Sequence, residues 1–184
     1  LNSILPTVDL PALPVADIWL AEVARLVPDI LDARPGILTP RQDAAQDHRR
    51  LFEGVMRFLA ALPAPVLVIL DDLQWADEAT ARLLAYLVRH LADQPILFAA
   101  ALRTDDTDES LKTTLWHLER EGYLARVTLD RLSPTAMTSL IQEMVGPQDR
   151  VERLGAWLHR ESAGNPLFSV EIMRSLMEAG TLLD

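Results

Sequence analysis

The 184-residue sequence contains no cysteine and only one lysine, Lys112. Without cysteine there can be no disulfide and no thiolate metal site, which fits a cytoplasmic protein. The longest apolar runs are far shorter than the roughly 20 residues that a helix needs to cross a bilayer. The first residues also lack the basic-then-apolar pattern of a signal peptide. These absences predict a cytoplasmic protein that does not contact a membrane.

Positive charge is scarce as well. The 17 Lys and Arg residues face 27 Asp and Glu, which gives a formal net charge of −10. Affinity for nucleic acid comes mostly from basic side chains on phosphates. We therefore expect no direct nucleic-acid contact from this chain. Its hydrophobic content of 49% is that of a globular protein, and its length allows one full-sized core or one core with a small satellite domain.

The chain is organised around the apolar run Val66–Leu70, which ends in Asp71 and Asp72. A short apolar run of this kind predicts a central parallel strand that is buried on both faces. Open α/β sheets bind ligands at the carboxyl ends of such strands. Two adjacent acids there suit a Walker B element, in which the first holds Mg²⁺ and the second orients or deprotonates the water that attacks a γ-phosphate. Turn and helix-cap chemistry explains the same pair equally well.

The residues that follow extend an α/β pattern. Asp77 can cap a helix over Glu78–Ala92, and a second apolar run, Ile96–Leu102, ends at Arg103. Strand, helix and strand with short links predict a parallel βαβ unit. The alternation of apolar and polar residues over Arg126–Asp130 predicts a third strand nearer the margin of the sheet.

Helices are predicted on both sides of this α/β core. Upstream, helical spacing of apolar residues predicts one helix over Val15–Val27 and another from Thr39 to about Leu62. From Ser133 onward the sequence predicts helices only, interrupted at Gly146-Pro147 and again at Gly164. We therefore divide the chain into an α/β part, residues 1–132, and an all-helical part, residues 133–184.

Four blocks of the sequence are informative when they are taken together, in their order along the chain. They read VLVILDDLQWAD from Val66, ILFAAALR from Ile96, ARVTLDRLS from Ala125 and ESAGNPLFSVEIMRSLME from Glu161. Together they resemble the signalling ATPases of the AAA+/STAND class. These include the ATPase modules of large LuxR-type transcriptional regulators and those linked to adenylate cyclases or serine/threonine kinases. The resemblance implies a P-loop NTPase core with a parallel sheet, followed by a helical lid subdomain.

The resemblance also implies roles for five residues. Asp71 would serve Mg²⁺, and Asp72 would take the place of the water-activating acid. Arg103 stands where the family keeps its sensor of the γ-phosphate, where a guanidinium stabilises charge on the transferring group. Gly164 and Pro166 match a Gly-x-Pro element whose proline ring packs on adenine. The implied cofactors are therefore ATP and Mg²⁺.

Structural explanations stand beside these roles. Arg103 could be a surface arginine that pairs with the acidic loop after it. Gly164-Asn165-Pro166 is fully explained as the end of one helix and the start of another. We expect Trp75 to pack beneath the strand end and Asp77 to cap a helix.

One part of the family's pattern is missing. A P-loop needs Gly-x-x-x-x-Gly-Lys-Ser/Thr, and Lys112 has no glycine near it. In the family this loop lies upstream on the first strand, so the chain is expected to be a piece of a longer polypeptide. The family's sheet order would then leave the strand at 126–130 without a neighbour and the strand at 96–102 with an open edge. Open edges favour association with another chain, so we expect self-association or incomplete folding.

Two functions of different classes follow. The first is the Walker B, sensor and lid part of an ATP-binding and hydrolysing switch in a signalling or transcriptional regulator, inactive without the missing loop. The second is a non-catalytic interaction or scaffold module that keeps the NTPase fold. Nucleotide and the rest of the parent polypeptide are the partners that we expect.

Overall fold

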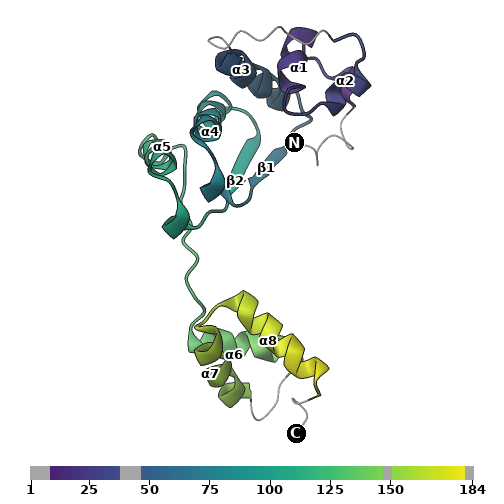
Figure 1. Cartoon of the computed structure of the whole chain (residues 1–184). Helices are drawn as coiled ribbons and strands as arrows, with labels where there is room; N and C mark the ends of the chain where they lie inside the picture. Colours follow the sequence, from purple (N-terminus) through teal and green to yellow (C-terminus); the bar gives the residue numbers. More distant parts are fainter. Residues whose placement is uncertain (1–8, 38–46, 147–150, 181–184) are drawn as a thin grey trace. The chain divides into compact units, whose positions relative to one another are not determined.

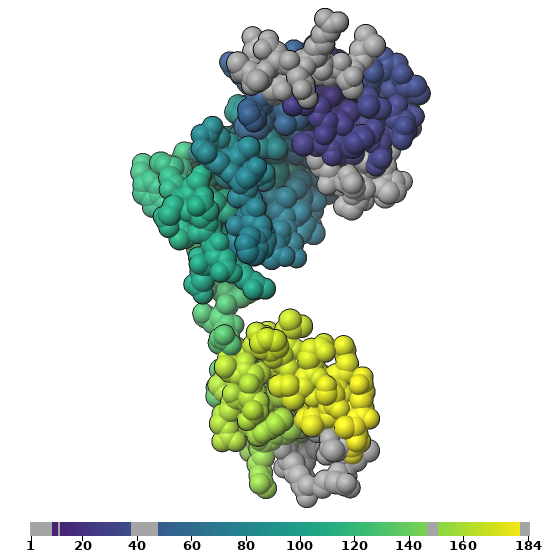
Figure 2. Space-filling model, in the orientation of Figure 1, coloured from purple at the N-terminus to yellow at the C-terminus, as the bar shows by residue number. Residues whose placement is uncertain are grey.

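The computed structural model describes residues 9–37, 47–146 and 151–180 (Figure 1). The chain divides into two compact units, Leu1–Arg126 and Val127–Asp184. Each unit has its own hydrophobic core, and Figure 2 shows each as a packed body of side chains. None of the helices in the described ranges is long and apolar enough to cross a membrane.

The first unit is mixed α/β, as predicted, with helices before, between and after two strands. In the residues that the structure describes, three short 3₁₀ turns, η2, η3 and η4, accompany them. In chain order its elements are η2 (Leu10–Ala12), α1 (Asp17–Val23), α2 (Asp29–Ala33), α3 (Asp47–Ala60), β1 (Val66–Leu70), η3 (Leu73–Trp75), α4 (Glu78–His90), β2 (Ile96–Ala100), η4 (Thr104–Asp106) and α5 (Glu109–Arg120). The predicted helix start at Thr39 lies outside the described residues.

The βαβ unit predicted from the sequence is present. Strands β1 and β2 are parallel and in register from Val66 opposite Ile96 to Leu70 opposite Ala100, with α4 as the crossover. Side chains alternate between the two faces of a strand. On the covered face, Val66 and Val68 pack against the core that α1, α2 and α3 build, and Leu70 packs beside α4 and α5.

The other face of this sheet is bare in the described residues. Leu67 and Leu97 are exposed on it, and Ile69 is 70% exposed. The prediction that β1 is buried on both faces is therefore wrong for this chain. Five consecutive apolar residues suit a strand between two layers, but the described helices of this unit supply only one layer.

The third strand predicted over Arg126–Asp130 does not form. Residues 124–133 carry no regular secondary structure, and Leu129 is 90% exposed. A strand needs a neighbour to pair its backbone N–H and C=O groups, and no described segment lies beside this one in a sheet. The alternating pattern is present in the sequence, but pairing decides whether it becomes a strand.

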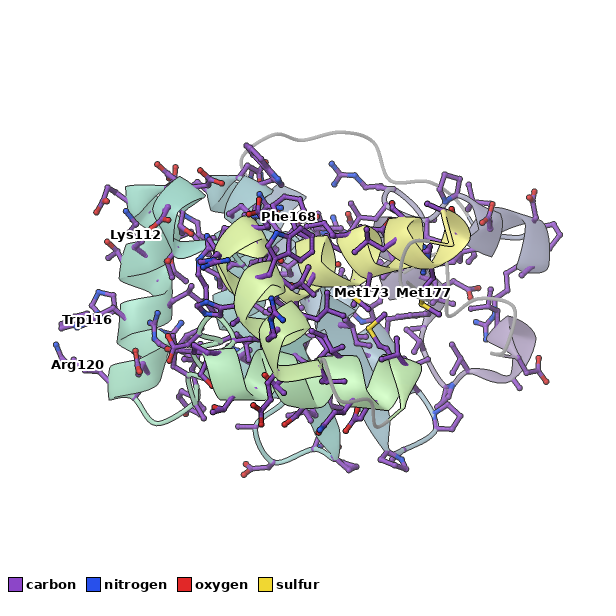
Figure 3. The ribbon with its side chains drawn as sticks, turned by 90° about the horizontal axis from the view of Figure 1, so that it is seen from below. Lys112, Trp116, Arg120, Phe168, Met173 and Met177 are labelled. Carbon is purple, nitrogen blue, oxygen red and sulfur yellow. The ribbon has the colours of Figure 1, made fainter. Side chains whose placement is uncertain are left out.

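The described part of the second unit is a group of three helices, α6 (Pro134–Val145), α7 (Val151–Ser162) and α8 (Pro166–Glu178). All three were predicted. Their apolar faces share one core, to which Met173 of α8 contributes a fully buried side chain (Figure 3). Gly155 on α7 permits close approach to α6, because a Cβ there would lie 2.5 Å from the Thr138 hydroxyl.

Candidate functional site

The carboxyl ends of β1 and β2 are tied together beyond the strands themselves. Ala101 donates its backbone N–H to Leu70 O at 2.9 Å, and Leu73 donates its N–H to Ala101 O at 2.9 Å. These bonds fix the turn that carries Asp71 and Asp72. Both acids are exposed at the strand end, which is the edge where the sequence predicted them.

Asp72 adopts a left-handed backbone conformation, with φ 53° and ψ 39°. Its N–H donates to Asp71 Oδ1 at 2.9 Å. Few residues other than glycine adopt this conformation, and Asp tolerates it because its short side chain makes local hydrogen bonds. The conformation turns the chain sharply out of β1 into η3 and leaves both carboxylates at the rim of the sheet.

Gln74 joins the two strand ends, and the sequence analysis assigned it no role. Its side chain is 4% exposed. Nε2 donates to Asp72 Oδ1 at 2.8 Å, and Oε1 accepts the backbone N–H of Arg103 at 3.1 Å. The signal in the sequence was a long amide placed two residues after an Asp-Asp pair, between Leu73 and Trp75.

Arg103 follows β2, and its main chain is well fixed. Its N–H is held by Gln74, and its C=O accepts the Thr107 hydroxyl at 2.6 Å. Its side chain is exposed, and within the described ranges the guanidinium makes no ion pair with Asp105, Asp106 or any other acid. The alternative in which Arg103 pairs with the acidic loop is therefore not what this structure contains.

The two residues expected to be structural behave differently. Asp77 caps α4, because its Oδ1 accepts the N–H of Thr80 at 2.8 Å. Hydrogen bonding from the Thr80 side chain, and then from its backbone N–H, lowers the pKa of the Asp77 carboxyl. Trp75 does not pack beneath the strand end, since 76% of it is exposed. Leu73 and Gln74 occupy the inward positions of the η3 turn, which leaves Trp75 on its outer side.

In the second unit, Gly164 lies between α7 and α8, and Pro166 begins α8. Gly164 has φ +75°, and a Cβ there would lie 2.7 Å from Leu132 O. Asn165 caps α8 by accepting the N–H of Leu167 at 3.0 Å, and Pro166 is the first residue of the helix. Helix geometry thus accounts for these residues within their own unit, while a contact with adenine stays a prediction.

The acids at the strand ends suit Mg²⁺ as an incomplete ligand set. Asp71 and Asp72 supply carboxylate oxygens, and Mg²⁺ in proteins is commonly held by one or two carboxylates together with phosphates and water. No group of three or more His, Cys, Asp or Glu residues in the described ranges is placed to hold a metal ion without such help. Phosphate oxygens would complete the coordination.

The single lysine does not belong to these strand ends. Lys112 lies on the outer side of α5 in a row with Trp116 and Arg120 (Figure 3), and its Nζ is 2.7 Å from Glu109 Oε1. Arg120 stacks over the Trp116 ring at 4.6 Å from its centroid. This side of α5 is a solvated helix face rather than a phosphate-binding loop.

Comparison with models of known protein families assigns the chain to a family. The family model of the AAA ATPase domain matches residues 5–99, just over half of the chain. The match includes Asp71 and Asp72 and ends before Arg103 and the second unit. Searches of curated proteins and of solved structures found no match. The mixed α/β fold with its parallel strand pair is compatible with part of such a domain. The chain belongs to the AAA ATPase domain family.

Proposed function

We propose that this chain is the Walker B, sensor and lid part of an ATP-binding and hydrolysing switch. One observation carries the proposal: two carboxylates stand at the end of β1, and a buried amide ties the second of them to the main chain of Arg103. Membership in the AAA ATPase family supports dependence on nucleotide and Mg²⁺ in general. The assignment of individual roles is our proposal.

In this proposal Asp71 and Asp72 divide the work at the strand end. The Asp71 carboxylate would hold Mg²⁺, which would supply positive charge to neutralise the phosphate oxygens. Asp72 accepts a hydrogen bond from the attacking water and thereby orients it. Its Oδ1 is already engaged by Gln74, so Oδ2 is the oxygen left for the water.

Arg103 and the helical unit complete the proposed switch. The exposed guanidinium of Arg103 would stabilise negative charge on the γ-phosphate. Gly164 and Pro166 would contact adenine, so that nucleotide binding and hydrolysis would hold and release the helical unit as a lid. The output, transcription or second-messenger signalling, would come from other domains of the polypeptide.

The switch needs a phosphate-binding loop that these 184 residues do not contain, since Lys112 is the only lysine and lies on α5. We therefore propose that the rest of the parent polypeptide supplies the loop, and that the chain alone does not hydrolyse ATP. Nucleotide and that remaining polypeptide are the proposed partners.

The second candidate function is a non-catalytic interaction module. It is favoured by the bare face of the β1–β2 sheet, where Leu67, Ile69 and Leu97 are exposed together. Exposed apolar patches of this kind mark interaction surfaces, and unpaired strand edges favour association. In this reading Asp71 and Asp72 serve only as turn residues.

A calorimetric titration separates the two functions. Mg-ATP is titrated into this chain and into the chain extended upstream through the glycine-rich loop that the family places there. The switch predicts a Kd of about micromolar order for the longer chain and no measurable binding to the shorter one. Absence of binding to both would contradict the switch and favour the interaction module.

A further inference from the structure

Gln74 stands out because it is a buried polar side chain with a partner at each end of its amide. Only 4% of it is exposed, although it lies in a turn next to two exposed acids. Nε2 is 2.8 Å from Asp72 Oδ1, and Oε1 is 3.1 Å from the backbone nitrogen of Arg103. The amide therefore connects Asp72 to the backbone of Arg103, which is 29 residues from Gln74 along the chain.

The chemistry of the two partners requires this kind of side chain. The ionised Asp72 carboxylate can only accept hydrogen bonds, whereas the Arg103 N–H can only donate one. A bridge between them needs a donor at one end and an acceptor at the other. Glutamine provides both without a charge, while glutamate of the same length provides two acceptors when it is ionised.

We propose that Gln74 is a positioning residue that fixes the rotamer of the Asp72 carboxylate and ties it to the main chain at Arg103. The exposed Asp72 side chain would otherwise rotate freely in water. Through these two hydrogen bonds, the Asp72 carboxylate and the backbone of Arg103 keep one relative position. The consequence for catalysis rests on the function proposed above, whereas the positioning itself does not.

The positioning is tested on this chain by NMR, without nucleotide. Gln74→Met removes both hydrogen bonds, and Gln74→Glu keeps an acceptor for the Arg103 N–H but removes the donor to Asp72. Gln94→Met is the matched control, because Gln94 is an exposed amide in a turn of the same unit. Circular dichroism on all variants verifies that each is folded.

Two readouts separate the two bonds. Exchange of the Arg103 amide hydrogen should be about tenfold faster in Gln74→Met and little changed in Gln74→Glu. Scalar couplings of Asp72 should report one χ1 rotamer in the wild type and averaging in both Gln74 variants. An Asp72 rotamer that is unchanged in both folded variants, or already averaged in the wild type, would overturn the proposal.

The catalytic consequence is tested in the longer chain that carries the phosphate loop. Both Gln74 variants should lower kcat by about tenfold, with KM for ATP within about twofold of the wild type. Wild-type kcat in Gln74→Glu would overturn the catalytic part, because that variant replaces the donor to Asp72 with a carboxylate that faces it. If the wild type itself does not turn over ATP, the proposed function falls, and the NMR result on this chain still decides the positioning.

Discussion

The carboxylate of Glu22 on α1 is almost fully buried, and its Oε1 lies 3.2 Å from Arg50 Nε on α3. Its other oxygen is 3.2 Å from Arg25 Nη1. Beside this pair, α1 and α3 pack closely, because a Cβ on Gly54 would lie 3.0 Å from Trp19 O. The ion pair between Glu22 and Arg50 therefore links α1 to α3 at a buried position.

Arg50→Met should destabilise the first unit. The variant leaves the buried Glu22 carboxylate with Arg25 as its remaining ion-pair partner in the described residues, and the loss of a charged hydrogen-bond partner at a buried acid costs about 1–3 kcal/mol. Urea unfolding followed by circular dichroism measures the change. The control is Arg82→Met, whose pair with Glu78 is exposed on α4, and it should cost less than about 0.5 kcal/mol. Equal effects in the two variants would contradict this role of Glu22.

Tyr86→Phe should weaken the contact between α3 and α4 in a pH-dependent way. The Tyr86 hydroxyl donates to Glu53 Oε2 at 2.8 Å, and this bond, with Arg57 nearby, lowers the pKa of the Glu53 carboxyl below its usual value of 4.5. A lowered pKa in the folded state stabilises the protein above that value and loses its effect as the pH falls through the folded-state pKa. The variant should therefore be about 1 kcal/mol less stable at pH 7. The difference should shrink in acid.

The opposite end of the pH scale gives a second check on the same bond. Burial, and then the bond to Glu53, raise the pKa of Tyr86 above 10.0. The stability that the protonated Tyr86 hydroxyl contributes is therefore present below pH 10 and is lost as the pH rises through the folded-state pKa. Urea unfolding from pH 3 to pH 11 measures both limits. Tyr123→Phe, at the other tyrosine of the chain, should leave the profile unchanged. A difference between Tyr86→Phe and the wild type that is constant with pH would contradict the bond.

Asp72→Asn should abolish most turnover in a chain that contains the phosphate loop. Asparagine keeps the size of the side chain and tolerates the left-handed backbone at this position, so the fold should be retained. It removes the charge that would orient the water, and we expect kcat to fall by about 100-fold or more. A steady-state phosphate-release assay measures the change. Unchanged turnover would remove Asp72 from the mechanism and favour a structural role for the acid pair.

The isolated chain should self-associate through its bare sheet. Ile69 is 70% exposed on β1, beside Leu67 and Leu97. Apolar side chains on an uncovered sheet with unpaired edges favour contact with a second copy. Sedimentation should show species whose size grows with concentration, and Ile69→Lys should shift them toward the monomer. The control is Ile18→Lys, because Ile18 is an exposed apolar residue on α1 rather than on the sheet. A monodisperse wild-type monomer with sharp, cooperative unfolding would contradict the prediction.

Gly164→Ala should destabilise the helical unit by more than the backbone cost of placing alanine at a positive φ. Its φ of +75° is unfavourable for alanine, and the new Cβ would lie 2.7 Å from the backbone oxygen of Leu132. The matched control is Gly180→Ala, at φ +69° with nothing within 4 Å, which carries only the backbone cost of about 1 kcal/mol. Thermal unfolding of both variants isolates the effect of crowding. Equal losses would mean that Leu132 moves aside without cost.

The sequence alone determined the features that depend on neighbouring residues. The period of its apolar residues predicted β1, α4 and β2 in parallel order, and the cap residues Ser133 and Asn165 marked the starts of α6 and α8. Asp77 was likewise recognised as a cap. Each of these depends on local hydrogen bonding or on a repeat along one segment, so a single sequence contains the information.

Tertiary structure decided the features that depend on what lies beside a segment. The alternation over 126–130 does not become a strand without a pairing neighbour, and β1 is apolar on both faces but covered on only one. Trp75 is exposed because Leu73 and Gln74 take the inward positions of the η3 turn. The bridge from Asp72 through Gln74 to Arg103 joins residues that only the folding of β2 against β1 brings within hydrogen-bond distance. A hydrogen bond acts over about 3 Å in space, and the spacing of residues along the chain does not specify which distant backbone group will lie there.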